Sequence, residues 1–269
     1  MHPRRLVRRG LLFAELSVNV QFLKTENKFM EAVALSNERH QDVMVNVEAR
    51  KEFGDHVNRA ILLSSEFGAA QKEFPILISK NTASGQLEAR AILGLEKDEN
   101  LFIDGTAWTS NYMPAVFARG PFSLGYVKDP EGGQSSDVRI MIDENNARIG
   151  KSGKAVFSEL GGETPYLEKI KRVLQLVDIG LNFDPNFYKQ ITNLELLEQV
   201  KISIRLSSEV EYTFSDYYTS NQEKFAALAP EALHDLHATG ALAPLFYLIS
   251  SLDNFQKLID LKNKRNGLV

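Results

Sequence analysis

The chain has 269 residues, of which 43% are hydrophobic and 25% are charged, and its formal net charge is −4. Such values are typical of a soluble globular protein large enough to bury its own core, and the negative charge argues against a general nucleic-acid binder. The absence of cysteine excludes disulfides, cysteine-based metal sites and thiol catalysis.

The first 29 residues are a basic leader that begins MHPRRLVRRG. The apolar run at residues 11–14 stops at Glu15, whereas a signal peptide needs about 7–15 apolar residues. Elsewhere no run approaches the roughly 18 apolar residues of a membrane span. We therefore predict a cytoplasmic protein without a transmembrane segment, with a loosely ordered leader at 1–29 and a single domain at 30–265.

Strand patterns dominate the first half of the chain. Apolar and polar residues alternate around Val43–Val47, which is the period of a half-buried strand. Residues 55–74 read as a helix with Ile61, Leu62 and Phe67 facing inward, ended by Pro75. Residues 75–81 and 86–95 read as an antiparallel hairpin. Further strands are expected at 100–105, at 121–128 and at 137–145, the last two on either side of a glycine-rich loop.

Helical patterns dominate the second half. Thr164 and Pro165 predict the start of a helix whose apolar stripe runs through Leu167, Ile170, Val173, Leu174 and Val177. Residues 193–200 read as a second helical piece, and 200–220 as a strand hairpin. Pro230 and Gly240 should bound a helix, and Pro244 should begin another with the stripe Leu245, Phe246, Ile249, Leu252 and Phe255. The expected fold is α+β, a largely antiparallel sheet in the N-terminal half with a helical C-terminal half packed on it.

Six segments, in this order along the chain, carry a resemblance to a known family. They read LSNERH, EFPILISKNTASGQLEARAILGLEKDENLFID, YMPAVFARGPFSLG, MIDEN, GKAVFSELGGETPYL and LHATGALAPLFYLISSLDNFQKL. On these segments the chain resembles the bacterial SapC family from about residue 30 to residue 261. This family takes its name from an association with surface-layer proteins, and it is distinct from the peptide-transport permease of the same name.

The resemblance implies an accessory role and names no catalytic residues. Relatives are often encoded near outer-membrane receptors, flavin-dependent tryptophan halogenases and cupin-like proteins, which suggests uptake or modification systems. The family usually has two basic residues before an aromatic–Pro–Phe, whereas this chain has Ala118, Arg119 and Gly120 before Pro121 and Phe122. A site that needed both cations is therefore in doubt.

Arg119 is the leading candidate for a binding residue. Its guanidinium can clamp a carboxylate or phosphate, and Trp108, Tyr112 and Phe122 can supply a stacking surface for the bound group. The alternative is that Arg119 pairs with an acid of the same domain, Asp104 or Asp143, and with backbone carbonyls near the two prolines. Trp108 can likewise be a core residue that closes one end of the sheet.

The remaining candidates are histidines and acids. His40 and Asp143 can act as acid–base groups or can be structural residues. His234 and His237 are spaced to share a helix face, but no third ligand is evident, so we predict no metal and no cofactor. Neither a dinucleotide-binding nor a P-loop glycine pattern occurs.

The sequence favours a non-catalytic binding or adaptor protein of a bacterial surface, uptake or peptide/amino-acid-modification system. Its partner would be a modification enzyme, a receptor or a surface-layer component, with an apolar groove near Trp108, Tyr112 and Arg119. The alternative is an enzyme of unrecognised type that acts on a peptide or amino acid, with Arg119 anchoring a carboxylate. The oligomeric state is left open.

Overall fold

The computed structural model describes residues 18–19, 32–128, 134–206 and 210–268. The predicted leader lies outside the described residues, except for the two residues of strand β1 (Val18–Asn19). Helices and antiparallel sheets are both present, and strands come mostly before helices along the chain, so the predicted α+β class is confirmed.

The central element is a five-stranded antiparallel sheet with the order β13-β14-β5-β6-β4. Its strands are β4 (Arg59–Leu62), β5 (Ile76–Lys80), β6 (Leu87–Ile92), β13 (Leu197–Arg205) and β14 (Glu211–Ser220). Ile76, Leu77 and Ile78 are fully buried, which is why this strand reads as a continuous apolar run. The predicted hairpin joins β5 to β6 through a turn that ends at Gly85, whose φ of 70° favours glycine.

A second antiparallel sheet has the order β1-β9-β10-β2. It contains β2 (Ala32–Ala34), β9 (Phe122–Lys128) and β10 (Gln134–Asp143). Two smaller sheets combine β3 (Met44–Val45) with β11 (Ile149–Gly150) and β12 (Lys154–Ala155), and β7 (Ile103–Asp104) with β8 (Ala107–Trp108).

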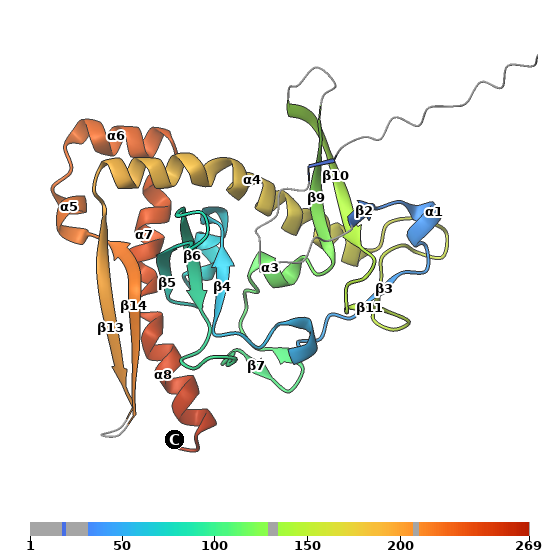
Figure 1. Cartoon of the computed structure of the whole chain (residues 1–269), viewed down its shortest axis with the longest axis horizontal. Coiled ribbons are helices and arrows are strands. Elements are labelled where there is room, and N and C mark those ends of the chain that lie inside the picture. The colour runs from blue at the N-terminus through green and yellow to red at the C-terminus, as the bar shows by residue number, and fades with distance from the viewer. Residues whose placement is uncertain (1–17, 20–31, 129–133, 207–209, 269) are drawn as a thin grey trace, which may run out of the picture.

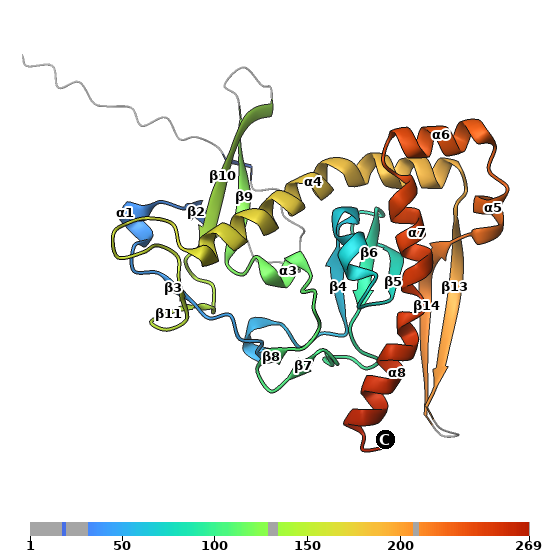
Figure 2. The same cartoon turned by 180° about the vertical axis from the view of Figure 1, so that it is seen from behind.

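The longest described helix is α4 (Pro165–Asn193), which crosses the molecule from the second sheet to the central one (Figures 1 and 2). The hydroxyl of Thr164 accepts a hydrogen bond from the amide of Leu167, and Pro165 is the first helical residue, as predicted. The other helical segments are α1 (Asn37–His40), η1 (Lys51–Phe53), η2 (Ser64–Glu66), α2 (Phe67–Ala70), α3 (Ala115–Ala118), α5 (Gln222–Ala226), α6 (Pro230–Ala238), α7 (Leu242–Ser251) and α8 (Asn254–Arg265).

Two hydrophobic clusters are evident among the described residues. The first lies around the central sheet and includes residues of α2, α6, α7, α8 and the C-terminal half of α4. The second lies between the sheet of β9 and β10 and the N-terminal half of α4, where Leu167, Ile170 and Leu174 are buried. α4 therefore contributes to both clusters.

Three sequence predictions were wrong. Residues 55–74 are not one helix, because Arg59–Leu62 forms strand β4 before the short helices η2 and α2. A short apolar run does not distinguish a buried strand from a helix. Residues 193–200 end α4 and begin β13. The C-terminal stripe is divided between α7 and α8, which leaves Phe246 52% exposed.

Candidate functional site: an apolar pocket ending at a half-buried arginine

The segment between the two prolines is a single helical turn followed by a strand. Pro114 directly precedes α3, and its carbonyl accepts hydrogen bonds from the amides of Phe117 and Ala118. Gly120 ends the turn with a φ of 54°, a left-handed conformation that favours glycine. Pro121 then leads into β9. The chain reversal places Arg119 between α3 and β9.

The guanidinium of Arg119 is bound by its own chain. Its Nη1 donates a hydrogen bond of 2.9 Å to the carbonyl of Phe122. Burial lowers the pKa of Arg119, and the nearby Asp143 carboxylate opposes this shift. The surroundings of Arg119 therefore agree with the second interpretation of the sequence, in which the guanidinium meets a backbone carbonyl and lies near Asp143.

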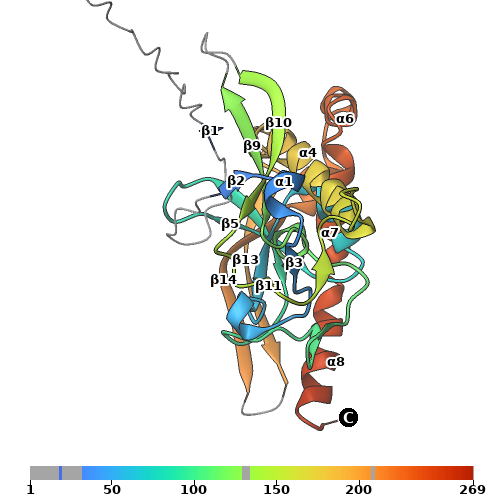
Figure 3. The ribbon, with the colours of Figure 1, turned by 90° about the vertical axis from the view of Figure 1, so that its right-hand side faces the viewer.

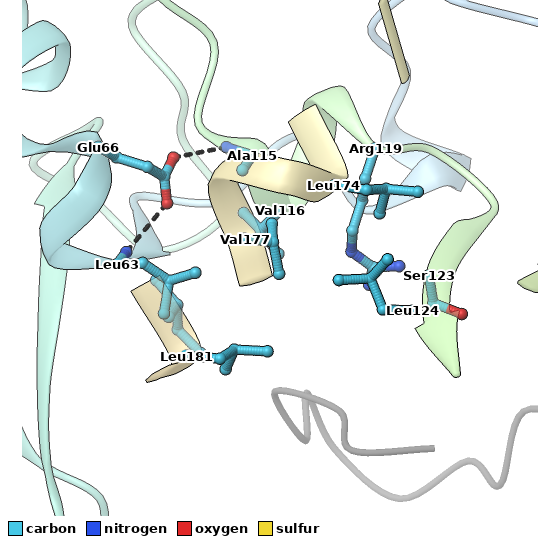
Figure 4. A pocket seen from close by; sticks show the side chains of 11 residues that line it. Leu63, Glu66, Ala115, Val116, Arg119, Ser123, Leu124, Leu174, Val177 and Leu181 are labelled. Atoms are coloured by element: carbon cyan, nitrogen blue, oxygen red, sulfur yellow. Dashed lines mark hydrogen bonds between the residues drawn. The ribbon is translucent and has the colours of Figure 1, made fainter. Parts of the chain in front are cut away.

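Arg119 also lines an apolar pocket between α3, α4 and β9. The pocket is lined by Ile61, Leu63, Glu66, Ala115, Val116, Arg119, Ser123, Leu124, Leu174, Val177 and Leu181. Figure 4 shows the Arg119 side chain directed toward Leu124 and Leu174, with Glu66 at the other side. The cavity volume is about 30 Å³, enough for one or two water molecules. Val116, Leu124, Val177 and Leu181 are half-buried, so the pocket reaches the surface.

Glu66 holds the other side of the pocket in place. Its carboxylate is 2% exposed and accepts hydrogen bonds from the Leu63 amide (2.9 Å), the Tyr112 hydroxyl (2.8 Å) and the Ala115 amide (2.7 Å). Burial raises the pKa of Glu66, and these three donors oppose the shift. Glu66 therefore ties η2 to the first turn of α3.

Trp108 and Tyr112 pack on the first hydrophobic cluster and do not line the pocket. The Trp108 ring contacts Phe74 and Phe117, with ring centroids 6.4 and 5.4 Å apart, and its Nε1 donates to the Tyr112 carbonyl at 2.9 Å. Burial raises the pKa of the Tyr112 hydroxyl. Both aromatics support the segment that carries Arg119.

Phe122, His40 and Asp143 lie around the second cluster. Phe122 is fully buried, so its ring is not accessible for stacking on a ligand. His40 is 1% exposed; its Nε2 lies 3.1 Å from a Glu144 oxygen and its Nδ1 lies 3.0 Å from the Ser36 carbonyl oxygen. The Asp143 carboxylate accepts the Asn145 amide at 3.1 Å.

Two consecutive acids at the end of β10 face two different arginines. Asp143 acts on Arg119, whereas the next residue, Glu144, accepts two hydrogen bonds from the Arg39 guanidinium at 2.8 and 2.6 Å. The Arg39 hydrogen bond is the main cause that lowers the pKa of Glu144. The end of β10 thus brings together four of the predicted site residues: His40, Arg119, Phe122 and Asp143. The other two, Trp108 and Tyr112, pack on the first cluster.

Sequence reasoning missed a half-buried acid on α4. Asp184 accepts hydrogen bonds from the amide (3.1 Å) and the hydroxyl of Ser64 in η2. Burial raises the pKa of Asp184 to about 6. The next residue, Pro185, lies inside α4. An acid next to a proline within a helical pattern is the sequence feature that could have pointed to Asp184.

The described residues offer no metal site and no membrane span. No group of three histidine, cysteine or acidic side chains among them is placed to hold a metal ion, and His234 and His237 are exposed. In the same residues, no helix combines the length and the apolar character needed to cross a bilayer.

Comparison with known proteins identifies the family. A family model described as SapC matches residues 35–258, which is most of the 269-residue chain. Neither the curated proteins nor the solved structures contain a significant match. The chain belongs to the SapC family.

Proposed function

We propose that this protein is a non-catalytic binding protein, an accessory component of a bacterial surface, uptake or peptide/amino-acid-modification system. It holds a protein partner at the pocket between α3, α4 and β9. The observation that carries the proposal is an apolar pocket, open at the surface, whose wall includes the half-buried Arg119. A recess of about 30 Å³ admits only the end of a side chain, so the partner would contact mainly the half-buried apolar residues around it.

The state of the ionisable groups favours binding over catalysis. The ionisable side chains that line the pocket within the described residues are Glu66 and Arg119, and both have internal hydrogen-bond partners. An enzyme acting on a peptide or amino acid would need an acid or base within reach of its substrate. Glu66 already accepts three donors, which opposes that role.

Site-directed photocrosslinking tests the proposal. The chain contains no cysteine, so Val177→Cys places a benzophenone label at the pocket and nowhere else. Ile179→Cys is the matched control, because Ile179 is 53% exposed on the same helix and does not line the pocket. In the native bacterium, we expect one protein to be crosslinked reproducibly from position 177 and not from position 179.

Two results would contradict the proposal. Equal crosslinking from both positions would mean that the pocket is not the contact surface. A purified, partner-free protein that turns over a peptide or amino acid would favour the enzyme instead.

A further inference from the structure

A leucine is fully exposed at the tip of a tight turn that precedes α4. Leu160 is 99% exposed. The turn is closed by hydrogen bonds from the Ser158 amide to the Gly162 carbonyl and from the Gly161 amide to the Ser158 carbonyl, both 2.8 Å. Phe157 and Glu163 form a bridge beneath it. We call residues 157–163 the Leu160 turn; its hydrogen bonds fix the leucine in an outward position.

A second pocket is lined by residues of β2, α1, β10 and α4 and by Phe157 and Glu163 of the Leu160 turn. Figure 3 shows α1, β2 and the start of α4 close together. Its volume is about 320 Å³, which is sufficient for an aliphatic side chain. The pocket is lined by Ala34, Leu35, Ser36, Asn37, Arg139, Ile140, Phe157, Glu163, Leu167 and Lys171. Leu35, Ile140, Phe157 and Leu167 make its apolar part, and they belong to the second hydrophobic cluster.

Leu160 cannot fill this pocket in its own molecule without breaking the turn. Phe157 and Glu163, which line the pocket, are also the residues that close the base of the turn. The side chain at the tip and the pocket are therefore adjacent features of one surface. An adjacent projection and recess are complementary to a copy of themselves related by a two-fold axis, which gives a closed dimer.

The charges around the two features are also complementary. Glu159 is exposed beside Leu160. Lys171 lies at the rim of the pocket, where its side chain is 44% exposed in an ion pair with Glu163, which is 45% exposed. Exposed ion pairs are weak and rearrange readily, so Lys171 can also meet a carboxylate from another molecule.

We propose that a second copy of this chain docks here: Leu160 of each copy enters the second pocket of the other, and Glu159 meets Lys171 across the interface. Because two leucines supply most of the buried apolar surface, the dimer is of the weak, reversible class and forms at high protein concentration.

Sedimentation equilibrium over a range of protein concentrations measures this association. We expect Leu160→Asp to raise the dimer dissociation constant about tenfold or more. Leu268→Asp is the matched control, since Leu268 is 63% exposed and distant from the turn in sequence, and it should leave the constant unchanged. A protein that stays monomeric at all concentrations, or a dimer that Leu160→Asp does not weaken, overturns the proposal.

A charge exchange tests the contact itself. Lys171→Glu should weaken the dimer by opposing Glu159, although it also removes the ion pair with Glu163 of its own copy. Glu159→Lys combined with Lys171→Glu should restore the dimer, and this rescue is the decisive result. Thermal unfolding of each variant shows that the fold is retained, because both positions are exposed. Failure of the double variant to recover association, with the fold intact, rules out the proposed pairing.

Discussion

Arg119 meets oxygen atoms of its own chain while its side chain forms part of a pocket wall. Its hydrogen bond to the Phe122 carbonyl and the nearby Asp143 carboxylate offset part of the cost of removing a guanidinium from water. The residue is therefore structural and accessible to a partner at once, and its substitution should affect folding first.

Arg119→Ala is expected to lower the free energy of unfolding by about 1–3 kcal/mol, because it leaves the Phe122 carbonyl without this donor and Asp143 without the nearby cation. Arg119→Met keeps the length of the aliphatic stem and should cost less. Urea unfolding of both variants measures the difference. An alanine variant as stable as the wild type would show that the guanidinium contributes nothing to the fold.

Asp184 should make stability depend on pH. Burial raises its pKa from 3.8 to about 6, so the folded state favours the protonated acid. The stability that this group contributes is fully present below pH 3.8 and is lost as the pH rises through 6. Asp184→Asn keeps an oxygen to accept from Ser64 and never ionises. We expect this variant to be more stable than the wild type at pH 8, on the order of 1–3 kcal/mol.

The comparison is made by urea unfolding at pH 8 and near pH 4, where the difference should vanish. Glu66 is a buried acid whose pKa is also raised by the Asp184 carboxylate, so Asp184→Asn should in addition ease the ionisation of Glu66. An asparagine variant that is less stable than the wild type at pH 8 would contradict the assigned direction.

The surroundings of single residues could be predicted from the sequence in part. The proline-framed sequence predicted that oxygens would surround Arg119, because a cation among apolar residues needs acceptors. It did not predict that Glu66 would bind Tyr112 and Ala115, or that Asp184 would bind Ser64. These partners are 46 to 120 residues apart in sequence, and no local pattern encodes such pairs.

Helix α4 and the short helix η2 are the elements that set the pocket's geometry. Ser65 Oγ donates to the Leu176 carbonyl at 2.9 Å, and Ser64 binds Asp184. Gly180 lies at their closest approach, where an added Cβ would be 2.5 Å from the Leu63 Cβ and 2.7 Å from the Ser65 hydroxyl. Because Leu63 and Leu181 both line the pocket, this contact fixes one wall.

Gly180→Ala should therefore destabilise the protein by about 1–3 kcal/mol through overpacking, although alanine is the better helix former by about 1 kcal/mol. Ile179→Ala changes the neighbouring, 53% exposed position and should have a much smaller effect. Thermal and urea unfolding measure both variants. A Gly180→Ala protein more stable than the wild type would mean that η2 can move away from α4 at little cost.

Elements with a clear start or a clear period were predictable, and those defined by tertiary contacts were not. Thr164 and Pro165 predicted the first turn of α4, and the alternation in β10 predicted a strand. Strand β4 was missed because its four residues acquire strand geometry by pairing with β6. Residues 193–200 have helix-forming composition, yet they enter β13 because that strand pairs with β14.

The whole molecule is organised around one helix that contributes to two hydrophobic clusters. Phe187 and Ile191 of α4 are fully buried in the first cluster, and Ile170 is fully buried in the second. Figures 1 and 2 show α4 spanning both regions. This arrangement leads us to expect that the two clusters unfold together.

Ile170→Ala tests that expectation, since it should cost about 2–5 kcal/mol in the second cluster. Trp108 is the sole tryptophan of the chain and packs on the first cluster. Its fluorescence should therefore report the same lowered unfolding midpoint as far-UV circular dichroism. If the Trp108 transition stays at the wild-type midpoint while the dichroism signal shifts, the two clusters unfold independently.

The position of the pocket between these clusters has a practical consequence. Val116 packs on the first cluster, and Leu124 and Leu174 belong with the second. A molecule bound among them would contact both clusters at once. It would raise the free energy of unfolding by RT ln(1 + [L]/Kd), where [L] is its free concentration, and would thereby raise the melting temperature. Differential scanning fluorimetry with candidate partners can therefore detect binding at this pocket without an assay of turnover.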